Sequence, residues 1–250
     1  MITKISIELE LPDKVQPRFL GSVLHGVIME RLPKDIVELL HHDYAYSPLK
    51  QRIYFNEHKP TWEIVSMSKE LTQHLFSFLG TDSTLFLRHY NANVELKGMK
   101  IEKYDVKEIM NTFLGDNELS RTLKINIVTP MSFKSNGHYM IFPDIKMFFR
   151  SIMIQFDVFF SEHKMYDKET LEFLNDNVHI VNYRMRSSSF SLEKVKIPAF
   201  LGEITMKVKG PLPFLQLVHF LVAFGELSGS GIKTSLGMGK YNIVHRKTIA

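Results

Sequence analysis

Proton transfer near neutral pH is the first chemistry that this sequence offers, through its 11 histidines, because the pKa of imidazole lies close to 7. His41 directly follows a short predicted helix over residues 34–40, and a helix C-terminus favours the imidazolium form. His25 lies on an earlier predicted helix, turned well off its apolar stripe. We interpret both as candidate acids or bases; the alternatives are a helix cap for His41 and a surface position for His25. His42 is the alternative to His41, since adjacent residues point in different directions.

A glycine-rich segment near the C-terminus offers a second chemistry, the binding of an anion. The segment reads G-S-G-I-K-T-S-L-G-M-G and spans residues 229–239. Glycine allows positive φ and leaves backbone N–H groups bare, so that successive amides can converge on a phosphate, while lysine and hydroxyl side chains add charge and donors. The residues that we predict to bind in this way are Gly229, Ser230, Gly231, Lys233, Thr234, Ser235, Gly237 and Gly239.

Two familiar nucleotide-binding loops do not fit this segment. A P-loop places Gly-Lys directly before a helix, but here Ile232 separates Gly231 from Lys233 and a strand is predicted to follow. A dinucleotide fingerprint needs glycine at position 234, where threonine stands. Two readings remain, a loop that only turns the chain and a loop that grips a phosphodiester backbone, and the two spaced glycine pairs favour the second.

Positive charge is concentrated in the second half of the chain. Residues 107–250 hold 18 basic against 13 acidic side chains, whereas residues 1–106 hold 13 against 14. Arg184 and Arg186 lie on a predicted strand and share one of its faces, because side chains alternate along a strand. A polyanion is a suitable partner for such a tract; a solvated strand face is the alternative.

Several classes of protein are disfavoured. The chain contains no cysteine, which removes disulfides and thiolate metal sites and suits a cytoplasmic protein. His138, His163 and His179 are not clustered with carboxylates at ligand spacing, so we predict no metal site and no cofactor. The longest apolar window, residues 213–224, is too short to cross a bilayer, so no membrane partner is expected. The overlapping segment, residues 211–224, is either a buried helix, the reading we favour, or part of a homodimer surface.

Hydrophobic periodicity predicts the same order of elements twice. The first half reads as a strand at 2–10, helices from Pro17 and at 34–40, strands at 50–57 and 61–67, a helix at 69–79 and a strand at 92–104. A linker is expected around 105–120. The second half reads as strands at 121–129, 178–191, 194–209 and 238–245, with helices at 143–160 and 212–226. We therefore predict an α+β protein with two tandem ferredoxin-like domains, residues 1–106 and 107–250.

The glycine-rich segment resembles the C-terminal signature of the CRISPR-associated repeat-processing endoribonucleases of the RAMP superfamily. The tandem order of elements, the chain length and the pattern L-H-G-V-I-M followed by L-L-H-H agree with this resemblance, which covers essentially the whole chain. It implies that the protein binds CRISPR repeat RNA and cuts the precursor once per repeat without a metal. The rival reading is a RAMP subunit that only packages guide RNA within an effector complex.

The resemblance also implies roles for particular residues. His41 matches the position of the family's usual catalytic histidine, and some members place a second one on the first helix, where His25 stands. Members often carry a tyrosine on that helix, but Met29 occupies its position here. Either Tyr44 or Tyr46 supplies the phenol instead, or no tyrosine is needed. The family's lysine after the catalytic histidine corresponds best to Lys50, with Arg52 as the alternative, and would stabilise the charge on phosphorus.

Overall fold

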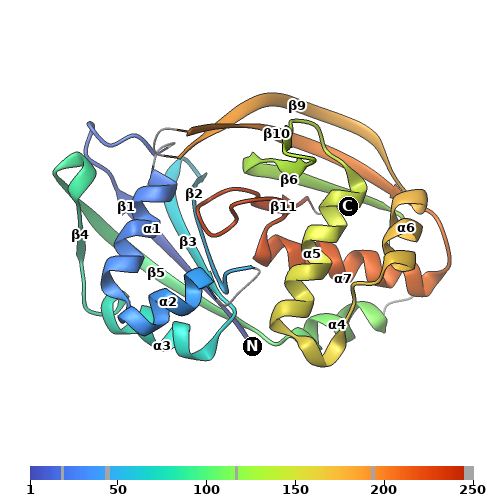
Figure 1. Cartoon of the computed structure of the whole chain (residues 1–250), viewed down its shortest axis with the longest axis horizontal. Coiled ribbons are helices and arrows are strands. Elements are labelled where there is room, and N and C mark those ends of the chain that lie inside the picture. Colours follow the sequence, from blue (N-terminus) through green and yellow to red (C-terminus); the bar gives the residue numbers. More distant parts are fainter. Residues whose placement is uncertain (18–19, 43–45, 116–117, 193–194, 245–250) are drawn as a thin grey trace, which may run out of the picture.

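The protein folds into two units of similar architecture that lie side by side (Figure 1). The computed structural model describes residues 1–17, 20–42, 46–115, 118–192 and 195–244, without the side chains of His41 and His42. Each unit contains one main antiparallel sheet, and helices cover one face of each sheet. The two sheets comprise five and four strands.

The N-terminal unit has the strand order β2-β3-β1-β5-β4. Its first four strands follow the ferredoxin-like arrangement, and β4 extends the sheet beyond β5. Alternation explains the strands, since Ile5, Ile7 and Leu9 of the first strand all enter the core. The elements are β1 (Ile2–Glu10), α1 (Leu20–Arg31), α2 (Lys34–His42), β2 (Leu49–Asn56), β3 (Lys59–Ser66), α3 (Lys69–Leu79), β4 (Thr84–Leu87) and β5 (Ala92–Tyr104).

The C-terminal unit repeats the arrangement with the strand order β11-β6-β10-β9. A short hairpin of β7 and β8 lies beside this sheet as a separate pair. The elements are α4 (Val106–Leu114), β6 (Thr122–Met131), β7 (Phe133–Ser135), β8 (His138–Met140), α5 (Ile145–Phe159), α6 (Lys168–Asn177), β9 (Val178–Leu192), β10 (Val195–Val208), α7 (Leu212–Ser228) and β11 (Tyr241–Ile243).

The predicted tandem ferredoxin-like fold is confirmed, but the predicted linker is wrong. Residues 105–120 contain α4, whose N-terminus is capped by the Asp105 side chain and whose Val106 enters the core of the C-terminal unit. The sequence prediction also missed β4, α6 and the hairpin of β7 and β8. The boundary at residue 106 falls at the first residue of α4 and stays a prediction.

The two units are joined by shared packing. Ile2, Val65 and Met67 of the N-terminal unit belong to the same apolar cluster as α5 and α7 of the C-terminal unit. The predicted burial of the apolar window is confirmed, because α7 buries Phe214, Phe220 and Phe224 among its other apolar residues. Within the described ranges, none of the helices has both the length and the hydropathy needed to cross a bilayer.

Candidate functional site at the glycine-rich loop

The glycine-rich loop, residues 229–240 between α7 and β11, is packed between the two units. Most of its residues are buried or half-buried, and only Lys233 is exposed. Its amides are largely engaged inside the protein. Gly231 N–H donates to Ser151 Oγ at 2.9 Å, and Gly239 N–H donates to the carbonyl of Pro130 at 2.9 Å. The bare amides that we expected are therefore not presented to solvent at these two glycines, because distant segments of the chain supply their acceptors.

Two of the glycines are required by close backbone approach. A Cβ on Gly231 would lie 2.4 Å from the carbonyl oxygen of Ser132, and one on Gly239 would lie 2.1 Å from that of Ser230. Both residues also have positive φ, at 91° and 78°. The partner that the loop approaches so closely is the protein's own backbone. The hydroxyl of Ser230 likewise turns inward, donating to the carbonyl of Phe148 at 3.0 Å.

The loop also contacts the first helix. A Cβ on Gly21 of α1 would lie 2.5 Å from the carbonyl oxygen of Leu236, so the loop rests directly against this helix. His25 is half-buried and follows one turn later on the same stripe as Gly21, with Met29 one turn further on. The contact therefore places the loop next to the stripe of α1 that carries a candidate histidine.

The loop meets the edge strand of the N-terminal sheet through Lys50. This lysine, predicted to face a substrate phosphate, is fully buried, and its Nζ donates to Thr234 Oγ1 at 3.1 Å. The rings of Tyr46 and Phe159 each lie 5.6 Å from the ammonium, which is a cation–π distance. Burial, together with the nearby Arg52 guanidinium, lowers the pKa of Lys50 to about 7.

Tyr46 is half-buried and reaches the same region from the segment before β2. It lines a small cavity of about 90 Å³ together with Arg150 of α5 and Gly231 and Ile232 of the loop. The structure thus brings three of the predicted residues together, because Lys50 is hydrogen-bonded to Thr234 and lies at cation–π distance from Tyr46. The alternative phenol, Tyr44, lies outside the described residues.

His25 and Lys50 approach the loop from opposite faces of the N-terminal sheet. α1 packs in the same cluster as Trp62 and Ile64, whereas Lys50 pairs with Val65, which points to the other face. Since β2 is the edge strand, the two faces meet around its edge.

α2 extends to His42, two residues beyond the predicted end, so His41 lies in its last turn rather than after it. Its side chain lies outside the description, and its role stays a prediction.

Arg52, the alternative to Lys50, is committed to a buried charge cluster between the units. Its guanidinium forms an ion pair with Glu63 of β3 and donates to the carbonyl of Leu227 at the end of α7 at 2.8 Å. Lys240 Nζ lies 3.6 Å from the same carboxylate, and the Tyr54 hydroxyl donates to it at 2.9 Å. Arg52 is therefore a link between the units, and Lys50 is the better candidate to stabilise charge on a substrate phosphate.

The charges in this cluster shift each other's pKa values. Burial alone would raise the pKa of Glu63, but Arg52 and Lys240 outweigh it and lower that pKa to about 2. Burial, helped by Arg52, lowers the pKa of Lys240 to about 8. The sequence analysis missed Glu63 and Lys240, because nothing in their local pattern distinguishes them from charges on a solvated strand.

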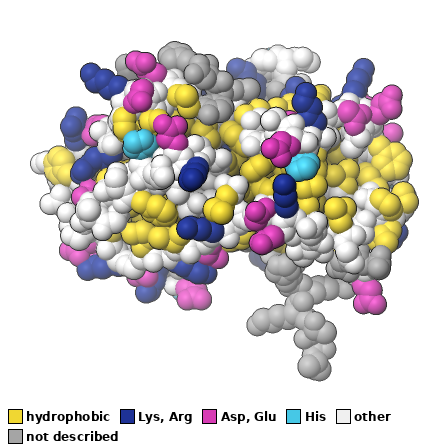
Figure 2. All heavy atoms as spheres, turned by 90° about the horizontal axis from the view of Figure 1, so that it is seen from below, with side chains coloured by type: hydrophobic (Ala, Val, Ile, Leu, Met, Phe, Trp, Pro, Cys, Tyr) yellow, Lys and Arg dark blue, Asp and Glu magenta, His cyan; other side chains and the backbone are white. Residues whose placement is uncertain are grey.

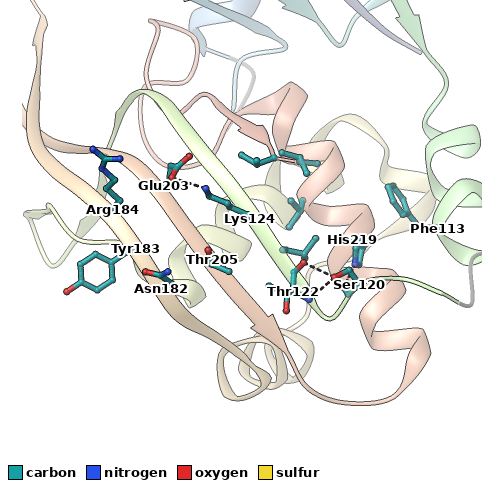
Figure 3. A pocket seen from close by; sticks show the side chains of 14 residues that line it. Phe113, Ser120, Thr122, Lys124, Asn182, Tyr183, Arg184, Glu203, Thr205 and His219 are labelled. Atoms are coloured by element: carbon teal, nitrogen blue, oxygen red, sulfur yellow. Dashed lines mark hydrogen bonds and ion pairs between the residues drawn. The ribbon is translucent and has the colours of Figure 1, made fainter. Parts of the chain in front are cut away.

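The two predicted arginines of β9 are exposed and line different cavities. Arg184 borders a cavity of about 540 Å³ beside Tyr183 and the ion pair of Lys124 with Glu203, which measures 2.9 Å (Figure 3). Arg186 lines a groove of about 850 Å³ that runs between the two units. The same groove is lined by residues of β9 and β10, by the start of α1 and by the loop, namely Ser187, Ser188, Ser189, Lys196, Pro17, Gly21 and Gly237.

Outside these cavities, charges of both signs are mixed. On the face seen in Figure 2, basic and acidic side chains are interspersed, and hydrophobic side chains gather mainly over the C-terminal unit at the right. The described residues contain no group of three or more histidine and carboxylate side chains that could hold a metal ion. The groove is thus the described surface that connects a basic strand with the glycine-rich loop.

Comparison with known proteins identifies the family. A family model described as CRISPR-associated endoribonuclease Cas6 matches residues 125–241. The chain is 30% identical over 232 residues to the Cas6 endoribonuclease of Streptococcus thermophilus, covering 91% of this chain and 93% of that protein. It is 26% identical over 246 residues to the Cas6 endoribonuclease of Mycobacterium tuberculosis, covering 96% of this chain and 76% of the relative.

A solved structure supports the same relationship at the level of the fold. A Cas6 product complex from Thermus thermophilus superimposes with a TM-score of 0.79 at 18% identity, over 98% of this chain and 100% of that one. Together with the identity to the streptococcal protein, this likeness confirms the predicted resemblance. The chain belongs to the Cas6 family of CRISPR-associated endoribonucleases.

Proposed function

We propose that this protein cuts precursor CRISPR RNA within its repeats by a metal-independent transesterification. The substrate's 2′-oxygen attacks the adjacent phosphorus while the bond from phosphorus to the 5′-oxygen breaks. One side chain accepts the 2′-hydroxyl proton, and another donates a proton to the leaving 5′-oxygen. The products carry a 2′,3′-cyclic phosphate and a 5′-hydroxyl. The observation that carries the proposal is the meeting of Tyr46, Lys50 and the glycine-rich loop in a chain of this family.

The proton transfers are assigned to His41 and His25. Both are imidazoles, whose pKa near neutrality suits either role. His41 lies in the last turn of α2, where the helix dipole favours the charged form, so it suits protonation of the leaving oxygen. His25 is one helix turn from the contact between Gly21 and the loop, and it takes the opposite role. Tyr46 supplies a phenol at the rim of the same region.

Lys50 supplies the charge that opposes the negative charge on phosphorus. A fully buried ammonium acts through its field, and the low dielectric of its surroundings makes that field stronger than it would be in water. Its lowered pKa, about 7, makes this charge dependent on pH in the physiological range. Charge stabilisation and proton transfer would thus come from separate groups.

The groove that runs between the units is the proposed path of the RNA. Arg186 and Lys196 line it on the hairpin of β9 and β10, and it leads to Gly21 and Gly237 beside the candidate site. Arg184, exposed on the same strand, extends the basic surface. Of the loop residues predicted to bind RNA, Lys233 and Ser235 are the accessible ones and are assigned to direct contact.

The test is incubation with an end-labelled repeat RNA from the same genome in excess EDTA. The matched control is the same RNA with one 2′-deoxy nucleotide at the cut. We expect a single cut that leaves a cyclic phosphate, and no cut in the deoxy substrate, because the nucleophile is missing. Tight binding without any cut would contradict the proposal and favour a subunit that only packages guide RNA. Cutting of the deoxy substrate, or cutting that EDTA abolishes, would contradict the mechanism.

A further inference from the structure

We propose that Thr234 is a positioning residue: its hydroxyl holds the Lys50 ammonium in place, so that the glycine-rich loop of the C-terminal unit completes the candidate site of the N-terminal unit. This inference rests on the proposed function. Thr234 was predicted to contact RNA, but the residue is only 4% exposed and its hydroxyl accepts the hydrogen bond from Lys50 Nζ.

The hydrogen bond to Thr234 is important for stabilising the buried ammonium of Lys50. Two aromatic rings, of Tyr46 and Phe159, also lie at cation–π distance from the ammonium, and neither offers a carboxylate. Arg52 on the same strand carries like charge and disfavours a second cation nearby. A buried cation needs a hydrogen-bond acceptor, and Thr234 Oγ1 supplies one.

The loop is built to hold Thr234 at this place. Before it, Gly231 is fixed by the Ser151 hydroxyl and by the close approach of the Ser132 backbone. Lys233, the residue that precedes Thr234, has a positive φ of 55°, which is the left-handed conformation of a turn. After Thr234, the backbone N–H of Met238 donates a hydrogen bond to the carbonyl of Lys233 at 3.2 Å and so closes the turn. The glycine pairs therefore have a positioning purpose that needs no contact with RNA.

Replacing Thr234 by valine removes the acceptor and keeps the shape of the side chain. The Lys50 ammonium then loses its hydrogen-bond acceptor, which disfavours the charged form. The pKa of Lys50 therefore falls further, and the lysine is neutral at neutral pH. Other titratable or charged groups of this region are the Tyr46 phenol, Arg52 on β2, and Arg150 of α5 and Lys134 of β7 in the adjoining cavity. None of these side chains is altered by the substitution.

The experiment measures the single-turnover cleavage rate of Thr234→Val across pH 5–9, with RNA affinity measured on the 2′-deoxy repeat. As the pH rises, the rate should fall where Lys50 loses its proton. We expect this falling limb of the pH profile to move about one to two pH units toward acid in the variant. The rate at pH 8 should fall about 10- to 100-fold, the rates at acid pH should converge, and affinity should not change. Thr234→Ser should restore the wild-type profile, because it restores the hydroxyl.

Two further variants separate this role from a general effect on folding or binding. In a Lys50→Met background, Thr234→Val should have no additional effect on rate, because the group it acts through is gone. Lys233→Ala, on the exposed neighbour, should weaken RNA binding and leave the position of the limb unchanged. An unshifted limb in Thr234→Val, or a loss of affinity with an unchanged rate, would overturn the inference. A wild-type protein that cuts no repeat would instead overturn the proposed function.

Discussion

At the scale of single residues, His41 and His42 pose the sharpest choice, because they are adjacent in the last turn of α2. Side chains one residue apart on a helix point about 100° apart, so one of them at most can serve the same proton transfer. We expect His41→Ala to lower the single-turnover rate about 10²- to 10⁴-fold, the usual contribution of a general acid or base. RNA affinity should not change, because the role that we propose for His41 is confined to the leaving group.

His42→Ala is the matched control for this prediction and should cut at close to the wild-type rate. The measurement is single-turnover cleavage of the repeat, with affinity measured on the deoxy substrate. The opposite pattern would move the role to His42. Unchanged cutting by both variants would remove this end of α2 from the mechanism.

Lys50 shows how burial changes the properties of an ordinary surface residue type, because desolvation lowers the pKa of its ammonium. Its position on an alternating strand could be predicted, but its complete burial could not, because Thr234 and Phe159 come from segments more than 100 residues away. Desolvation of a lysine costs stability, and a lysine at a fully buried position fits the role in charge stabilisation that we propose for it. The sequence signal for Lys50 was the family resemblance alone.

At the scale of elements, the contact between α1 and the glycine-rich loop can be tested by two alanines on one helix. A Cβ on Gly21 would lie 2.5 Å from the carbonyl oxygen of Leu236, whereas a Cβ on Gly26 would meet nothing within 4 Å. We expect Gly21→Ala to lower the free energy of unfolding by about 1–3 kcal/mol through overpacking. Gly26→Ala should raise it by about 0.5–1 kcal/mol, because alanine is the better helix former.

Chemical unfolding of the two variants and the wild type provides the measurement. Since the displaced loop carries Thr234, Gly21→Ala should also slow RNA cleavage, whereas Gly26→Ala should leave it unchanged. Equal stabilities of the two variants would show that Gly21 of α1 does not pack closely against the carbonyl of Leu236 in the loop.

The elements were predicted best where hydrophobic periodicity is strong and local. Apart from β4, the strands of both sheets were expected from their apolar pattern, and so were α1, α3, α5 and α7. α4 was predicted to be a linker because its apolar side, including Val106 and Phe113, packs against α7, which lies about 100 residues away in the sequence. No local pattern reveals that partner. The glycine-rich loop was located correctly, but the direction of its polar groups depends on Ser132, Ser151 and Pro130, which no local pattern reveals.

At the scale of the whole molecule, the charge cluster of Arg52, Glu63 and Lys240 joins the two units. Arg52 and Glu63 are almost completely buried, and Arg52 also caps the end of α7 through the carbonyl of Leu227. Removing one member of such a cluster leaves the others buried without compensation, which typically costs about 3–5 kcal/mol. The cluster therefore fixes the relative position of the sheet that carries Lys50 and the loop that carries Thr234.

The lowered pKa of Glu63 makes this link sensitive to acid. Its folded-state pKa of about 2 lies below the ordinary value of 4.5, so the folded carboxylate resists protonation. The resulting stabilisation is fully present above pH 4.5 and is lost as the pH falls from 4.5 toward 2. At about 1.4 kcal/mol per unit of pKa shift, the effect is on the order of 3 kcal/mol.

Urea unfolding of wild type and Glu63→Gln between pH 7 and pH 2.5 tests this link. We expect the variant to be less stable by about 3 kcal/mol at neutral pH and the two curves to approach each other below pH 4.5, because protonation removes the same charge from the wild type. Glu95→Gln is the matched control, since Glu95 forms an exposed ion pair with Lys97, and it should change stability by less than about 0.5 kcal/mol. A stability difference for Glu63→Gln that persists unchanged into acid would show that the carboxylate's charge does not hold the two units together.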